Sequence, residues 1–185
     1  MNGDLEDLGA LGAYVFIAVG SNIEPERNMA RGLELLSRRV QLKKVSTIYR
    51  TKPQGRPGQA PYLNGVCAVR TRISPRLLKF AVLREIERAV GRIRSRDKYA
   101  SRELDLDILI YDTLVSEQED LRLPDPDIRT RLFVAAPLLE LTPDLVLPDT
   151  GEGLADIVDA LKRQGCTQGV PDPCLSQFLR ERLDL

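Results

Sequence analysis

Two aspartates, Asp105 and Asp107, stand two residues apart inside an otherwise apolar run at residues 103–111, which reads ELDLDILIY. A run of this length and composition is typical of a buried strand. Because side chains alternate along a strand, both aspartates are expected on one face, with their Cα atoms about 7 Å apart. The opposite, core-facing side would carry the apolar residues Leu104, Leu106, Ile108 and Ile110.

Two carboxylates on one strand face repel each other unless a positive charge lies between them. Oxygen ligands at this spacing suit Mg²⁺, which favours carboxylates together with substrate phosphates. The pattern therefore predicts a metal site at Asp105 and Asp107. The alternative is an exposed strand face on which both aspartates are simply solvated.

A cluster of basic residues directly precedes this strand, in a chain whose formal net charge is zero. Its members lie between positions 84 and 102 and are Arg84, Arg88, Arg92, Arg94, Arg96, Lys98 and Arg102. Arginine offers forked donors to phosphate oxygens, and phosphoryl transfer depends mostly on positioning and charge neutralisation. The combination with a metal site therefore predicts phosphoryl chemistry, whereas a solvated loop paired to nearby acids is the alternative.

Several classes of function are excluded by composition. The 185 residues include no histidine, which removes histidine bases, histidine metal ligands and Ser-His or Cys-His nucleophile pairs. No GxxxxGK[ST] motif is present, so a phosphate-handling enzyme here would not use a P-loop. The neutral charge predicts neither a nucleic-acid nor a membrane partner, and no run is long enough to span a bilayer. Three cysteines without framework spacing, Cys67, Cys166 and Cys174, suit a reducing, cytoplasmic location and no metal role.

The order of expected elements is strand, helix, strand, strand, helix, strand. The strands are expected at residues 14–19, 40–51, 62–72 and 103–111, and the helices at 26–37 and 74–90. In the second strand one face would carry Val45, Thr47 and Tyr49, and in the second helix the apolar stripe would be Leu78, Val82, Ile86 and Ala89. Proline- and glycine-rich or polar loops at 51–61 and 91–101 separate these elements.

This order predicts an α+β fold with a ferredoxin-like βαββαβ core, an antiparallel sheet flanked by helices in three α/β/α layers. After it we expect a small hairpin near residues 114–123, a short helix after residue 124, and terminal helices at 153–161 and 175–183. The chain is expected to divide into a disordered lead-in (1–13), a single domain (14–163) and a tail with a short helix (164–185). The acidic lead-in lacks the basic start and apolar core of a signal peptide.

An ordered set of short motifs resembles the 6-hydroxymethyl-7,8-dihydropterin pyrophosphokinase family of folate biosynthesis. The resemblance covers roughly residues 14–151, and its most specific block is RELDLDIL downstream of GRIR. The motifs are Gly20-Ser21-Asn22, Tyr49-Arg50-Thr51, Tyr62-Leu63-Asn64, Glu87, Gly91-Arg92-Ile93-Arg94, Ser101 to Asp107, and Arg131-Leu132-Phe133.

The resemblance implies that the chain transfers the β,γ-diphosphate of ATP to the pterin hydroxymethyl group and releases AMP. Asp105 and Asp107 would hold two Mg²⁺ ions, and Arg92 and Arg102, as mobile-loop arginines, would bind ATP and neutralise transition-state charge. Further ATP-binding residues would be Glu87, Arg94, Ile108 and Arg131. The pterin side would be formed by Asn22, Thr51, Gln54, Tyr62, Asn64, Tyr99 and Phe133. The partners would be small-molecule substrates, and a monomer is expected.

Two segments depart from the pattern of the family. The loop reads Tyr99-Ala100-Ser101-Arg102 where many relatives have an aromatic residue before Gly-Pro-Arg, and Asp125 stands between two prolines where the family has histidine. An ionised Asp125 cannot donate to phosphate, and we expect it to pair with Arg129 or Arg131. These departures leave open a non-catalytic nucleotide-binding relative that acts as a regulatory or interaction module.

Some of the singled-out residues also allow simpler interpretations. Asn64 can be a turn residue at a strand edge, Phe133 a core residue and Glu87 an exposed helix residue. An RNA-binding domain of ferredoxin-like topology would need stacking aromatics on its central strands. Only 5% of the chain is aromatic, which disfavours that function.

Overall fold

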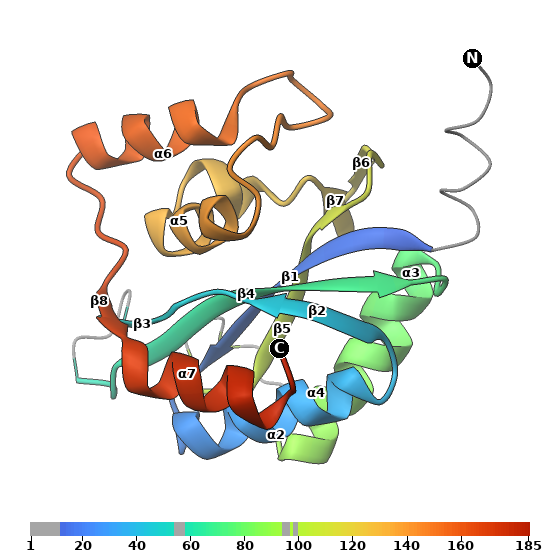
Figure 1. The fold of residues 1–185 in the computed structure, drawn as a ribbon, viewed down its shortest axis with the longest axis vertical. Helices are drawn as coiled ribbons and strands as arrows, with labels where there is room; N and C mark the ends of the chain where they lie inside the picture. The colour runs from blue at the N-terminus through green and yellow to red at the C-terminus, as the bar shows by residue number, and fades with distance from the viewer. Residues whose placement is uncertain (1–11, 54–57, 94–96, 98–99) are drawn as a thin grey trace.

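In the computed structural model of the protein, helices pack against the faces of one main antiparallel sheet (Figure 1). The structure describes residues 12–53, 58–93, 97 and 100–185. Within these residues the main sheet has the strand order β5-β1-β4-β3-β8, and β2 pairs with β4 beside β3. Its first elements are β1 (Ala13–Ser21), α2 (Pro25–Ser37), β2 (Gln41–Val45), β3 (Ile48–Thr51), β4 (Tyr62–Thr71), α3 (Pro75–Leu77), the π-helical η1 (Leu78–Leu83), α4 (Arg84–Val90) and β5 (Asp105–Tyr111). This is the predicted βαββαβ unit.

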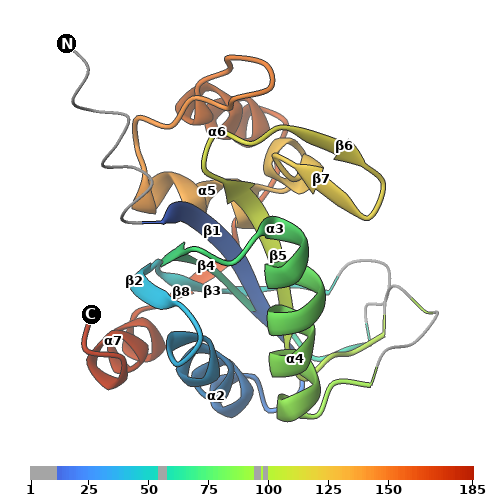
Figure 2. The ribbon, with the colours of Figure 1, turned by 90° about the vertical axis from the view of Figure 1, so that its right-hand side faces the viewer.

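Helices cover both faces of the sheet and give the three expected layers (Figures 1 and 2). On one face, α2 and the η1–α4 helix bury a core that includes Ile17, Leu33 and Leu106. On the other face, α5 (Leu132–Leu141) and α6 (Leu154–Arg163) enclose a second core around Phe16 and Leu138. The site described below lies on the second face, beside the polar end of β5.

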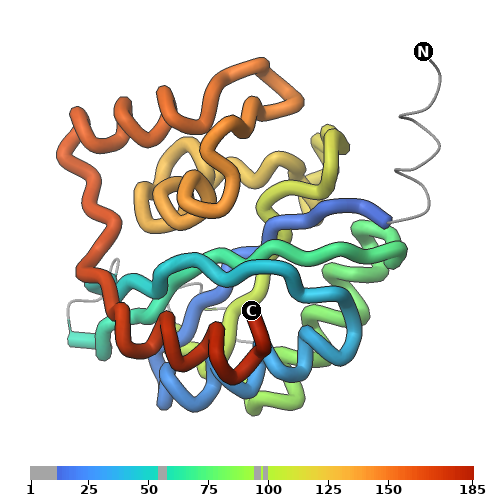
Figure 3. Tube along the Cα trace, in the orientation of Figure 1, coloured from blue at the N-terminus to red at the C-terminus, as the bar shows by residue number. Residues whose placement is uncertain are grey.

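The segment that follows residue 163 completes the sheet. Its strand β8 (Val170–Asp172) pairs with β3, and α7 (Pro173–Arg182) buries Leu175 and Leu179 against the first core. The hydroxyl of Ser176 accepts a 2.8 Å hydrogen bond from the backbone N–H of Ile48. Figure 3 follows this path from α6 on one face to α7 on the other.

A small hairpin and a 3₁₀ turn link β5 to α5. They are β6 (Ser116–Gln118), β7 (Leu121–Leu123) and η2 (Pro126–Arg129). The hairpin confirms the expected one. None of the described helices combines the length and the apolar character that a membrane span requires.

The expected strand at residues 40–51 is divided into β2 and β3. The division falls at Ser46, where the side-chain hydroxyl takes the place of a backbone carbonyl in the pairing with β4. The backbone N–H of Ser46 donates to Val66 O at 2.9 Å, and its Oγ accepts from Val66 N–H, also at 2.9 Å. The break shifts the alternation, so that Val45 and Ile48 share the first core while Thr47 binds Glu140 of α5. The prediction that Val45 and Thr47 share a face is therefore wrong.

The expected helix at residues 74–90 contains the π-helical turn η1, and three residues of its predicted apolar stripe, Leu78, Val82 and Ile86, are buried as predicted. An extra residue in one turn rotates everything that follows relative to an ideal helix. Leu83 and Val90 are consequently buried, whereas Ala89, predicted in the stripe, is exposed.

Strand β5 contains a bulge at Leu109, since β1 pairs Phe16 with Ile110 and the next residue, Ile17, with Ile108. A bulge adds one residue and reverses the faces beyond it. Ile110 therefore packs in the second core with Leu109, not beside Leu106 and Ile108 as predicted. The first part of the strand keeps the predicted alternation, with Asp105 and Asp107 on the face opposite Leu106 and Ile108.

Candidate active site

A cavity of about 610 Å³ lies at the polar end of β5. Strands β1, β3, β4 and β5 supply its floor, η1 and α4 one wall, and the segment from β7 to α5 another. Its charged lining consists of Lys52, Lys79, Arg84, Arg92, Arg102, Arg131, Asp105, Asp107, Asp120, Asp125 and Asp127. The strand and the basic segment singled out in the sequence thus meet in one cavity.

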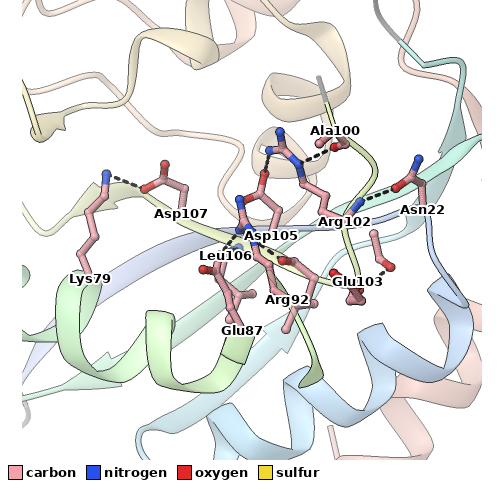
Figure 4. A network of polar contacts seen from close by, with 12 residues as sticks. Asn22, Lys79, Glu87, Arg92, Ala100, Arg102, Glu103, Asp105, Leu106 and Asp107 are labelled. Carbon is pink, nitrogen blue, oxygen red and sulfur yellow. Dashed lines mark hydrogen bonds and ion pairs between the residues drawn. The ribbon is translucent and has the colours of Figure 1, made fainter. Parts of the chain in front are cut away.

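Asp105 is held between two arginines that come from the polar loop before β5 (Figure 4). One carboxylate oxygen of Asp105 accepts from Arg92 and the other from Arg102. Behind them, Arg92 also donates to Glu87, whose side chain is 2% exposed. The other acceptor role of Glu87 is structural, because its Oε1 accepts from Leu106 N–H at 3.0 Å. We name Glu87, Arg92, Arg102 and Asp105 the arginine cluster.

The electrostatics of the arginine cluster favour the ionised form of Asp105. Burial alone would raise the pKa of Asp105, but the charges of Arg92 and Arg102 outweigh burial, so the pKa lies below its ordinary value.

Asp107 faces a different set of groups, although it lies on the same strand face as Asp105. Its Oδ1 is 2.8 Å from Nζ of Lys79, a residue of η1 (Figure 4). Asp125 lies near both groups, on the segment that enters η2. We name Lys79, Asp107 and Asp125 the aspartate cluster.

Burial raises the pKa of Asp125 to about 6; the hydrogen bond from the Asp127 N–H opposes this shift, and the charge of Asp107 adds to it. The side chain of Asp125 caps η2 by accepting from that N–H at 2.8 Å. The expected pairing of Asp125 with Arg129 or Arg131 is wrong, because Arg129 binds Asp149 and Glu152 while Arg131 binds Asp127.

Four of the residues expected on the pterin side line the same cavity: Thr51, Tyr62, Asn64 and Phe133. Asn64 donates to Thr51 Oγ1 at 2.7 Å, and Tyr62 donates to Ala100 O at 3.3 Å. Gly20 lies against this group, where a Cβ atom would come within 2.8 Å of Asn64 Oδ1. The floor is thus polar, with Phe133 as an aromatic wall.

Asn22 joins the loops at the cavity entrance but is not among the residues that line the cavity. It is 4% exposed. Its Oδ1 accepts from Arg102 N–H at 2.8 Å, and its Nδ2 donates to Ser101 Oγ at 3.1 Å and to Ala60 O at 3.4 Å. This amide therefore fixes the start of β5 relative to the loop that precedes β4.

Other expected site residues have different positions from those predicted. Ile108 is 1% exposed in the first core, and Leu109 lines the cavity instead because of the bulge. Glu87 is buried behind Arg92, which rules out the exposed helix position. Arg131 lines the cavity beside Phe133, with its guanidinium carbon 5.8 Å from the ring centre. Three expected residues, Gln54, Arg94 and Tyr99, lie outside the described residues.

Sequence reasoning missed Lys79 and Asp127. Lys79 belongs to the expected helix, three, four and seven residues before the buried Val82, Leu83 and Ile86, so helical spacing was an available signal that it lies on the buried side. Asp127 pairs with Arg131 at 3.0 Å across one turn. That spacing of four residues is visible in the sequence and was the available signal.

The donor set at Asp105 and Asp107 fits Mg²⁺ in chemical terms. Both side chains present hard carboxylate oxygens and are 37% and 45% exposed, so a cation can reach them from the cavity. In the part of the chain that the structure describes, no three His, Cys, Asp or Glu residues gather as a metal site. A pair of carboxylates matches the habit of Mg²⁺, which keeps water and substrate phosphates as its other ligands.

Comparison with known proteins identifies relatives along most of the chain. A family model described as 7,8-dihydro-6-hydroxymethylpterin-pyrophosphokinase matches residues 16–143. The chain is 38% identical over 138 residues to the 2-amino-4-hydroxy-6-hydroxymethyldihydropteridine pyrophosphokinase of Haemophilus influenzae, covering 73% of this chain and 85% of that protein. It is 36% identical over 154 residues to the protein of the same name from Pseudomonas aeruginosa, covering 82% and 93%.

Longer proteins contain a similar segment. The chain is 38% identical over 153 residues to the folic acid synthesis protein fol1 of Schizosaccharomyces pombe. The matched segment covers 81% of this chain but only 21% of that protein. A crystal structure of HPPK-DHPS in complex with substrates superposes with a TM-score of 0.66 at 12% identity, covering 82% of this chain and 44% of that one. At that identity the superposition supports the fold.

Proposed function

The chain belongs to the 7,8-dihydro-6-hydroxymethylpterin-pyrophosphokinase family, and we propose that it transfers the β,γ-diphosphate of ATP to 6-hydroxymethyl-7,8-dihydropterin. The pterin hydroxymethyl oxygen would lose its proton to water and bond to the β-phosphorus as the bond from that phosphorus to the α–β bridging oxygen breaks, releasing AMP. The observation that carries the proposal is one cavity that combines Asp105, Asp107, Arg92 and Arg102 with the polar floor at Thr51 and Asn64. The reaction belongs to tetrahydrofolate biosynthesis, and we expect a cytoplasmic monomer.

Each side chain has a role that its contacts support. Asp105 and Asp107 would hold two Mg²⁺ ions, which neutralise phosphate charge when bound. Arg92 and Arg102 are aimed at Asp105 in the free protein and would extend their remaining donors to phosphate oxygens. Glu87 acts through Arg92, since it is buried and holds that guanidinium in place. Glu87 is therefore a positioning residue.

The pterin would occupy the floor of the cavity. A pterin ring presents amide-like donors and acceptors at its edge and a flat π-face. The Asn64–Thr51 hydrogen bond fixes two polar groups that match such an edge, and Phe133 offers a ring on which the face can stack. We propose that Tyr62 closes the side near Ala100 and that Arg131 binds the nucleotide.

The test is product analysis. Incubation with ATP, Mg²⁺ and 6-hydroxymethyl-7,8-dihydropterin should yield AMP and the pterin diphosphate in equal amounts, and chelation of Mg²⁺ should stop the reaction. Formation of ADP, or of no product by protein that is shown to be folded, would overturn the proposal.

A non-catalytic nucleotide-binding relative is the second candidate, and Asp125 is the observation that favours it. This carboxyl group lines the cavity, where burial and then the charge of Asp107 raise its pKa, and an ionised group there opposes phosphate binding. Calorimetry separates the two candidates. Mg²⁺-dependent ATP binding without AMP formation would favour the second.

A further inference from the structure

Lys79 is a cation of the cavity to which the catalytic scheme gives no role. Its side chain is 21% exposed and lines the cavity, and its Nζ lies 2.8 Å from Asp107 Oδ1. Figure 4 shows it reaching β5 from the helix, on the side away from Arg92 and Arg102. Lys79 therefore serves a different part of the cavity from the two arginines.

Lys79 lies on the buried side of its helix, three and four residues before the buried Val82 and Leu83. Its neighbour Leu78 is fully buried in the first core, which fixes the start of the turn. Phe80 lies between two guanidinium groups, with Arg76 and Arg84 at 5.0 Å and 4.3 Å from its ring centre. Residues on either side of Lys79 are thus anchored, and π-helical turns of this kind often occur at functional sites.

The charges around Lys79 indicate what it can bind. Asp107, Asp125 and Asp127 line this part of the cavity, so a polyphosphate that entered it would meet carboxylates. A metal ion at Asp107 would neutralise that carboxylate and weaken its attraction for the ammonium group. Lysine carries a compact charge on a flexible four-carbon chain, which allows its Nζ to move to a nearby phosphate oxygen.

We propose that Lys79 is a phosphate-binding residue for the nucleotide. Its ammonium group pairs with Asp107 in the free protein and with a phosphate oxygen in the complex. Lys79 supplies positive charge to the part of the cavity that Asp107 and Asp125 line with carboxylates. The inference rests on the proposed function, because it requires a nucleotide in this cavity.

The test is calorimetry with α,β-methylene-ATP and Mg²⁺ on wild type, Lys79→Met and Lys79→Arg. Lys79→Met removes a charge-assisted hydrogen bond and should weaken binding by about tenfold or more. Lys79→Arg should restore most of the affinity. Lys43→Met, a change of an exposed lysine on β2, is the matched control and should bind as wild type does.

Adenosine separates phosphate binding from a structural role. Lys79→Met should bind adenosine as wild type does, because adenosine has no phosphate. Equal weakening for adenosine and the ATP analogue would overturn the proposal, as would wild-type affinity for the analogue in Lys79→Met. If wild type itself binds no analogue, the proposed function fails. If wild type binds the analogue and Lys79→Met binds it equally well, only this inference fails, so the two failures are distinguishable.

Discussion

In the arginine cluster each carboxylate binds a guanidinium group, whereas in the aspartate cluster Asp107 and Asp125 share the neighbourhood of Lys79. The two clusters begin from the same strand face, since Asp105 and Asp107 are two residues apart on β5. One carboxyl in each cluster has a shifted pKa, Asp105 in the first and Asp125 in the second, and the two shifts have opposite directions. The pKa of Asp105 is lowered by two arginines, and that of Asp125 is raised by burial and the charge of Asp107.

The difference shows that partners from other elements, not the strand itself, decide what a carboxylate does. Arg92 and Arg102 come from the loop before β5, and both donate hydrogen bonds to Asp105. The aspartate cluster carries more negative than positive charge, which an added cation would relieve. We therefore expect the arginine cluster to hold the free structure together and the aspartate cluster to respond to ligands.

Replacing Asp105 or Asp107 of β5 by asparagine should have the largest effects and tests the contrast between the two clusters most directly. We expect Asp105→Asn and Asp107→Asn each to lower turnover by at least about a thousandfold, because phosphoryl transfer depends on charge neutralisation. Only Asp105→Asn should also lower the free energy of unfolding, since it leaves Arg92 and Arg102 without their shared carboxylate. AMP formation and urea unfolding measure the two effects. Equal stability losses in both variants would contradict the contrast.

Glu87→Gln tests whether burial strengthens the arginine cluster. The side chains of Glu87 and Arg92 are 2% and 12% exposed, and breaking such a buried pair typically costs about 3–5 kcal/mol. Glutamine can still accept from Leu106 N–H, so the loss should lie near the lower end of that range.

The matched control for this change is Glu85→Gln on the same helix. Glu85 binds Arg39 at the surface, and its side chain is 56% exposed. An exposed pair contributes about 0–1 kcal/mol. Guanidinium unfolding of both variants should therefore give clearly different midpoints, and similar midpoints would show that burial of Glu87 is not what matters.

Asp125→Asn should reveal the opposite electrostatics of the aspartate cluster. The pKa of Asp125 rises from 3.8 to about 6 on folding, so the folded state holds its proton more tightly than the unfolded state. This contribution to stability is present below pH 3.8 and is lost as pH rises through about 6. Two units correspond to at most about 3 kcal/mol.

The measurement compares unfolding free energies of wild type and Asp125→Asn from pH 4 to pH 7. Asparagine can keep the cap on η2, so the variant should gain stability relative to wild type as pH rises. The contribution of Asp105 to the free energy of unfolding has the opposite pH dependence. Its pKa is lowered in the folded state, so the protein loses this contribution as pH falls. A pH-independent difference between the two proteins would contradict the prediction.

The parts that sequence predicted well are those set by local periodicity. Alternation places Asp105 and Asp107 on one face, and the order of the elements predicts the ferredoxin-like core. Periodicity fails where one extra residue enters an element. The bulge at Leu109 moves Ile110 to the other core.

Long-range contacts explain the rest of what sequence could not predict. The break at Ser46 depends on Val66, and the place of Glu87 depends on Leu106 of β5. Neither partner is close in sequence, so no local pattern could indicate these contacts. The pairing of β8 with β3 is of the same kind, since 120 residues or so separate these strands.

Arg76→Ala should have the smallest effect on stability, because it removes an exposed ion pair at the border of the aspartate cluster. Arg76 donates to both carboxylate oxygens of Asp120, at 3.1 Å and 2.9 Å. Asp120 lines the cavity together with Asp107 and Asp125. The side chains of Arg76 and Asp120 are 56% and 51% exposed, so solvent screens the pair in spite of its two-point geometry. We expect no measurable change in the urea midpoint. A shift as large as that of Glu87→Gln would mean that geometry, rather than burial, separates the two clusters.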